Sequence, residues 1–131
     1  MPEKPRIVIA EDDVMLSETM RDVLEEDFTV ETVGDGQEAI RVAHRDHPDV
    51  MVLDAQMPLL DGLSACRALR DDPRTADVQI IVTTGASPAE AASRAFDAGA
   101  TDFIAKPFSV SQLRARAATC AMRATEAREA S

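Results

Sequence analysis

The sequence predicts an α/β fold with a parallel β-sheet, because five short apolar runs alternate with helical patterns and the connections between them are short. The run Val50-Met51-Val52-Leu53 shows the pattern most clearly, with four consecutive apolar residues and no polar alternation. Such runs are typical of strands that are buried on both faces. The 131 residues are enough for one domain of common size with a substantial core.

The elements are expected in strict alternation along the chain. Strands are expected at residues 6–10, 28–33, 49–54, 78–84 and 101–105. The first helix carries Leu16, Met20, Val23 and Leu24 at helical spacing, and the second spans residues 37–47 before Pro48. The other three begin at Asp61, Ser87 and Ser109. Asp61 is expected to act as an N-cap, whereas Ser87 and Ser109 each open a capping box.

Composition narrows the class of protein. The net charge of −10 disfavours electrostatic binding to nucleic acid or anionic lipid and suits cations or basic partner surfaces. Cys66 and Cys120 fall on apolar positions of helical patterns, which indicates small buried side chains rather than a disulfide or a metal pair. Neither a signal peptide nor a membrane span is expected, and a cytoplasmic location follows.

Polar residues stand where the predicted strands end. Glu11 and Asp12 follow the first strand, Asp54 ends the third, Thr84 the fourth, and Lys106 follows the fifth. The carboxyl ends of parallel strands share one edge of a sheet, and ligands bind there. We therefore expect these residues to converge, although they are far apart in sequence.

Three carboxylates brought together require a compensating charge. At about 5 Å each pair repels by roughly 3 kcal/mol at an effective dielectric near 20. A site made of oxygen ligands suits Mg²⁺, which binds through one or two carboxylates plus a phosphate. With the Lys106 ammonium and the Thr84 hydroxyl nearby, the sequence predicts a phosphoryl site in which Asp54 is the nucleophile.

These residues give the chain a resemblance, over nearly its full length, to the receiver domain of two-component response regulators. It rests on the following residues: Glu11-Asp12, Asp54 with Met57-Pro58 and Asp61-Gly62, Thr84, and Lys106-Pro107-Phe108. The family resemblance implies a flavodoxin-like (βα)5 fold, with a five-stranded parallel sheet in order 2-1-3-4-5 and helices on both faces.

The resemblance also implies a role for each site residue. Asp54 accepts a phosphoryl group from the phosphohistidine of a histidine kinase, and Thr84 and Lys106 hold the phosphoryl oxygens. Asp12 ligates Mg²⁺ directly, Glu11 does so largely through water, and the backbone carbonyl of Gln56 completes the protein's share of the metal shell. The peptide bond before Pro107 is expected to be cis.

Switching is expected to spread from the site to one face. Thr84 and the aromatic switch residue Phe103 move on phosphorylation, which biases the face formed by the fourth helix, fifth strand and fifth helix. Phe103 lacks the hydroxyl of the more frequent Tyr, and Gly85 replaces the common Ala. In the family the positions of Gln56 and Ala86 tune the phosphoryl lifetime, and we expect Gln56 to dominate.

The expected partners are a histidine kinase or a histidine phosphotransfer protein, and a downstream effector protein or fused output domain. A phosphorylation-dependent homodimer is a further expectation, without direct contact to nucleic acid or membrane. The chain is expected to catalyse only its own phosphorylation and dephosphorylation. It forms one receiver domain over residues 1–131, with a core at about 5–122 and a helical extension or connector at 123–131.

Three alternatives remain open from the residues alone. A Mg²⁺-dependent phosphatase could work through an aspartyl-phosphate, but such enzymes place an acid/base Asp two residues after the nucleophile, where this chain has Gln56. A flavodoxin-like cofactor binder would need a phosphate loop where Glu11-Asp12-Asp13 would repel phosphate. A receiver-like module that binds partners without phosphorylation would not need the complete acceptor set.

Overall fold

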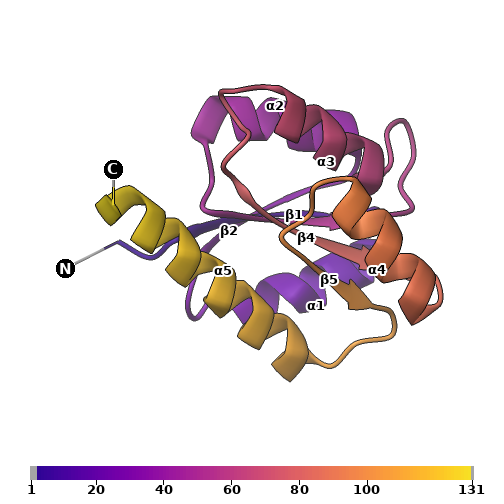
Figure 1. Ribbon diagram of the computed structural model, residues 1–131. Coiled ribbons are helices and arrows are strands. Elements are labelled where there is room, and N and C mark those ends of the chain that lie inside the picture. Colours follow the sequence, from indigo (N-terminus) through magenta and orange to yellow (C-terminus); the bar gives the residue numbers. More distant parts are fainter. Residues whose placement is uncertain (1–2, 131) are drawn as a thin grey trace.

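Five parallel strands form a single sheet in the computed structural model, which describes residues 3–130 (Figure 1). The strands, in the order β2-β1-β3-β4-β5, are β1 (Arg6–Ala10), β2 (Thr29–Val33), β3 (Val50–Asp54), β4 (Gln79–Thr84) and β5 (Asp102–Ala105). The helices are α1 (Val14–Leu24), α2 (Gly36–Asp46), α3 (Gly62–Asp71), α4 (Pro88–Asp97) and α5 (Val110–Ala130). The predicted strand order and alternation are confirmed.

The helices cover the sheet in two layers, one on each face (Figure 1). On one face α1 and α5 bury a cluster that includes Met20, Leu24 and Leu113. On the other, α2, α3 and α4 bury a second cluster with Val42 and Leu69. All five residues of β3 are buried, as expected for the central strand.

Three aspartates occupy helix N-caps, and of these only Asp61 was predicted from the sequence. Asp13, Asp35 and Asp61 occupy the N-caps of α1, α2 and α3, and each accepts a hydrogen bond from a backbone N–H in the first turn. Ser109 accepts one from the N–H of Gln112 at 3.1 Å. The prediction of a capping hydrogen bond at Ser87 is wrong. Ser87 takes the N-cap position of α4, but its side chain makes no cap hydrogen bond.

Two glycines allow close backbone contacts near the site. Gly36 lies one residue before the predicted start of the second helix, but it is the first residue of α2, and its N–H donates to the carbonyl of Leu60 at 3.0 Å. A Cβ there would lie 2.1 Å from that oxygen. Gly62 begins α3 so close to β3 that a Cβ would lie 2.2 Å from the carbonyl oxygen of Asp54. Both positions therefore exclude a side chain.

Helix α5 remains against the body of the protein to its last turns. Its inner residues Leu113, Ala117 and Cys120 are buried, and further on Arg128 forms an ion pair with Asp49, just before β3. Both cysteines, Cys66 and Cys120, are free and buried, as the sequence indicates. Among residues 3–130, no helix has both the length and the apolar character needed to cross a bilayer.

Candidate functional site

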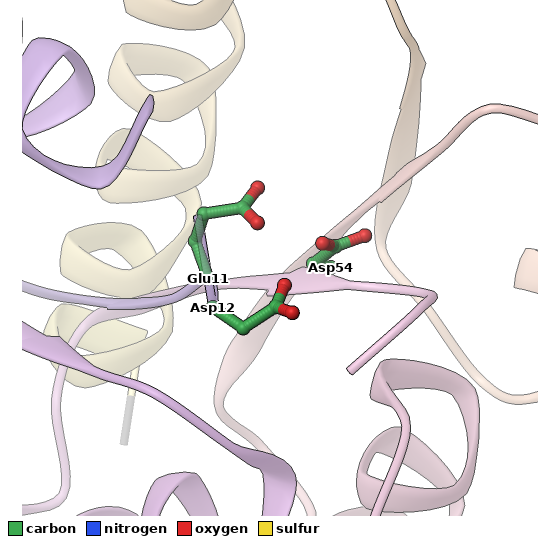
Figure 2. A group of neighbouring side chains, drawn as sticks. All are labelled: Glu11, Asp12 and Asp54. Carbon is green, nitrogen blue, oxygen red and sulfur yellow. The ribbon is translucent and has the colours of Figure 1, made fainter. Parts of the chain in front are cut away.

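The carboxyl ends of the central strands bring the predicted acids together. Glu11 and Asp12 directly follow β1, and Asp54 is the last residue of the adjacent β3. Figure 2 shows the three carboxylates facing a common space from these two strand ends. One oxygen from each lies within 4.8 Å of the others. The predicted convergence is therefore present in the structure.

The three acids differ in their contact with solvent. Glu11 and Asp54 are only 4% and 3% exposed, whereas Asp12 is exposed at the rim. Backbone N–H groups orient the two buried carboxylates, because Asp13 donates to Glu11 Oε2 at 3.2 Å and Gln56 donates to Asp54 Oδ1 at 3.1 Å. The site thus has a preformed, buried wall and an open acidic rim.

Lys106 provides the positive charge of the site. Its Nζ lies 3.0 Å from Glu11 Oε1 and 3.1 Å from Asp54 Oδ2. The backbone positions it, since the N–H of Lys106 donates to the carbonyl of Thr84 at 2.7 Å where β4 and β5 end. The peptide bond between Lys106 and Pro107 is cis. A single ammonium therefore bridges two buried carboxylates.

The cluster changes the protonation of its members. Burial, followed by the closeness of the Asp54 carboxyl, raises the pKa of Glu11 from 4.5 to about 7. Burial opposes the charge of Lys106, but its hydrogen bonds to Glu11 and Asp54 outweigh that effect and raise its pKa. Three acids and one ammonium leave an excess of negative charge in a largely buried space, which favours a bound cation.

The donor set fits a hard divalent cation. All three side chains offer carboxylate oxygen, the ligand type of Mg²⁺ and Ca²⁺, and sulfur and imidazole are absent from the group. The exposed Asp12 leaves the site open to water, and Mg²⁺ keeps several of its waters when bound. The residues present therefore fit the expected magnesium ion.

Thr84 and the residues around it border the acids. Thr84, 5% exposed, ends β4, and its hydroxyl oxygen accepts a hydrogen bond from the N–H of Ala86 at 3.1 Å. Phe103 in β5 is half-buried and packs its ring edge-on against Phe96 of α4, with centroids 5.8 Å apart. The predicted switch pair thus comes from adjacent strands, and Phe103 contacts α4 through an aromatic pair.

Two features near the site were missed from the sequence. Gly62 lets α3 start against the backbone of Asp54, and the Asp61-Gly62 dipeptide was available as its signal. A pocket of about 220 Å³ is lined by residues of α3 and α4, and Gln56, Thr84, Arg67 and Arg94 all border it. No sequence pattern marks this pocket, because it depends on how the two helices pack.

Comparisons with known proteins agree on one family. The family model described as "Response regulator receiver domain" matches residues 7–118. The chain is 40% identical over 112 residues to the response regulator MprA of Mycobacterium leprae, covering 85% of this chain and 48% of that protein. It is 35% identical over 113 residues to the "DNA-binding dual master transcriptional regulator RpaA" of Synechocystis, covering 86% and 47%. The chain thus spans about half the length of these relatives.

Solved structures give the same picture. The receiver domain of sensor histidine kinase PA1611 from Pseudomonas aeruginosa has a TM-score of 0.77 and 30% identity, covering 85% of this chain and 92% of that one. That structure holds a magnesium ion coordinated in its active site cleft. A signal receiver domain from Syntrophus aciditrophicus has a TM-score of 0.83 and 31% identity, covering 90% of each chain.

Proposed function

Because the chain belongs to the response regulator receiver domain family of two-component systems, we propose that it is a switch controlled by phosphorylation of Asp54. Receiver domains are signalling proteins rather than classical enzymes, and response regulators interact with histidine kinases and output effectors. One observation carries the proposal: the carboxylates of Glu11, Asp12 and Asp54 converge, and the Lys106 ammonium bridges two of them, Glu11 and Asp54. These residues form a charged site at the sheet edge where α/β folds bind ligands.

The chemistry assigned to Asp54 is nucleophilic. One carboxylate oxygen attacks the phosphorus of a phosphohistidine, the P–N bond breaks, and the histidine leaves with the bonding pair and takes up a proton. Lys106 and Thr84 hold phosphoryl oxygens, which places positive charge and a hydroxyl donor where negative charge develops. Bound Mg²⁺, held by Glu11, Asp12, Asp54 and the backbone carbonyl of Gln56, supplies further charge neutralisation. The chain itself thus promotes its phosphorylation and later hydrolysis.

Gln56 is the residue to which we assign control of the phosphoryl lifetime. It is exposed, its side chain is polar, and its N–H donates to Asp54 Oδ1 at 3.1 Å. Ala86 is half-buried and has no polar side-chain atom with which to orient water. Replacing Gln56 is expected to change the dephosphorylation rate more than replacing Ala86, and an unchanged rate in a Gln56 variant contradicts this assignment.

The aromatic contact between Phe103 of β5 and Phe96 of α4 supports an assignment of the surface through which the domain acts on its partners. A phosphoryl group adds nearly two negative charges at Asp54, which draws Thr84 and Lys106 toward it. Movement of Thr84 and of the loop after β4 affects α4, against which Phe103 packs through Phe96. The α4–β5–α5 face is therefore assigned to effector or output-domain docking and to a phosphorylation-dependent homodimer.

An exposed apolar surface next to the site suits the phosphoryl donor. Val14 and Met15, at the start of α1, are 67% and 80% exposed. Leu16, Pro107 and Phe108 line a hollow beside them together with Lys106. Exposed apolar side chains that adjoin an active site are typical of docking surfaces. We assign this one to the histidine kinase or histidine phosphotransfer protein.

The extent of the domain is part of the same proposal. A single receiver domain over residues 1–131 accounts for the five alternating strand–helix pairs. Residues 123–131 then serve as a helical extension or as a connector toward an output domain, since α5 continues as one helix through Ala130.

Intact-mass measurement after incubation with acetyl phosphate and Mg²⁺ tests the proposal. We expect a mass gain of one phosphoryl group, lost on hydrolysis and absent in Asp54→Asn. The matched control is Asp97→Asn, an exposed carboxylate on α4 outside the site, which should still be phosphorylated. No adduct on the wild-type protein contradicts the proposal, and multiple turnover of a phosphomonoester points instead to a phosphatase.

A further inference from the structure

The pocket between α3 and α4 is bordered by two arginine residues. It is lined by residues of the β3–α3 loop, α3, the end of β4 and α4, and its volume is about 220 Å³. Arg67 of α3 and Arg94 of α4 both border it, together with the hydroxyl-bearing Ser64. A space of this size suits one small ligand group rather than a peptide segment.

Neither arginine side chain makes an ion pair or a hydrogen bond with the described residues 3–130. Most Lys and Arg side chains in residues 3–130 make ion pairs or hydrogen bonds, but the side chains of Arg67, Arg94 and Arg123 make none. Two of these three arginines, Arg67 and Arg94, border the same pocket.

Each arginine even has an acid one helical turn away. Arg67 precedes Asp71 by four residues, and Glu90 precedes Arg94 by four, which is the spacing at which helical ion pairs form. Neither pair is present in the structure, where both arginines border the pocket instead. Asp61, which also lines the pocket, has its carboxylate engaged by the N–H and hydroxyl of Ser64 at 2.8 and 3.3 Å.

We propose that this pocket binds a small oxyanion, a phosphate or a carboxylate, held between the guanidinium groups of Arg67 and Arg94. Guanidinium groups present several N–H donors in a planar fork that matches both kinds of anion. The hydroxyl of Ser64 already donates its one proton to Asp61, so the two guanidinium groups supply the donors for the anion. The pocket adjoins the magnesium and phosphoryl site and shares Gln56 and Thr84 with it, but Glu11, Asp12, Asp54 and Lys106 do not line it.

The position of the pocket gives the bound anion a route to the switch. Gln56 and Thr84, which border the acceptor, also line this pocket, as does Ala91 of α4. An anion bound there contacts both the acceptor loop and the helix that responds to it. Binding at the two sites is therefore coupled, and any effect of the anion on the equilibrium of phosphorylation is matched by an equal effect of phosphorylation on anion affinity.

Titration followed by backbone amide resonances tests the binding directly. Inorganic phosphate and succinate are added separately to the protein without Mg²⁺ or a phosphodonor, at constant ionic strength. We expect saturable shifts at Ser64 and Ala91 with a dissociation constant in roughly the millimolar range. The stronger of the two probes identifies phosphate or carboxylate as the preferred group.

Variants at the exposed arginines make the test specific. The double variant Arg67→Gln/Arg94→Gln should bind at least about tenfold more weakly, whereas Arg123→Gln removes the same charge from α5 and should leave the affinity unchanged. Non-saturable shifts, or equal affinity in the double variant and wild type, overturn the proposal. Since no metal or phosphodonor is present, such a failure is independent of whether Asp54 is phosphorylated.

Discussion

The carboxyl of Glu11 is buried between Lys106 and Asp54, and burial raises its pKa to about 7. Between pH 4.5 and 7 the folded, metal-free protein therefore binds a proton that the unfolded chain releases. The stability that the protonated Glu11 carboxyl contributes is fully present below pH 4.5 and is lost as the pH rises through 7. We expect the free energy of unfolding in EDTA to fall from pH 5 to pH 8.

Denaturant unfolding of wild type and Glu11→Gln at both pH values measures this effect. The neutral amide of Glu11→Gln does not titrate, so the variant should lose less stability than wild type between pH 5 and pH 8. Equal losses in the two proteins would show that Glu11 does not titrate in this range.

In the metal-free site the Asp54 carboxylate repels those of Glu11 and Asp12, although it also contacts the Lys106 ammonium. Asp54→Asn removes one of three crowded carboxylates, keeps an oxygen for the N–H of Gln56, and leaves Lys106 paired with Glu11. Because each close pair of carboxylates repels by roughly 3 kcal/mol, we expect the variant to be more stable than wild type by at least about 1 kcal/mol at pH 8 without metal. Denaturant unfolding measures it, with Asp97→Asn as the surface control; destabilisation by Asp54→Asn would contradict the account of the cluster.

The contact between α3 and β3 depends on Gly62. A Cβ at this position would lie 2.2 Å from the carbonyl oxygen of Asp54, so Gly62→Ala must displace either the helix or the acceptor strand. We expect a loss of about 1–3 kcal/mol in the free energy of unfolding, together with weaker magnesium binding.

Gly34→Ala is the matched control for that substitution. A Cβ at Gly34 would have no atom within 4 Å, and the backbone there does not need a positive φ. Its stability should stay within about 0.5 kcal/mol of wild type. Equal effects of the two substitutions would show that close approach to Asp54 is not what Gly62 provides.

At the level of elements, local patterns predicted the helices and strands but not all of their details. Asp61 begins α3 as expected, because a short acidic side chain at that position caps the backbone whatever the tertiary context. Ser87 opens a predicted capping box, as Ser109 does, and yet only Ser109 makes a cap hydrogen bond. Gly36 belongs to α2 because its N–H pairs with Leu60, a long-range contact that no local pattern reveals.

Across the whole molecule, the parallel sheet explains why the acid cluster could be predicted. Once the strands are parallel, residues at their carboxyl ends must share one edge, so Glu11 and Asp54 meet although they are far apart in sequence. The Arg67–Arg94 pocket could not be predicted in this way. It depends on the spacing between α3 and α4, which cover the same face of the sheet, and on the orientation of the exposed side chains of Arg67 and Arg94.

The central claim is that Glu11, Asp12 and Asp54 form one cation site, and calorimetric titration of metal-free protein with Mg²⁺ at pH 8 tests it most directly. We expect a single site per chain that is lost or greatly weakened in Asp12→Asn, with a raised unfolding temperature in the presence of the metal. Absence of binding by wild type, or equal binding by wild type and Asp12→Asn, would contradict the claim.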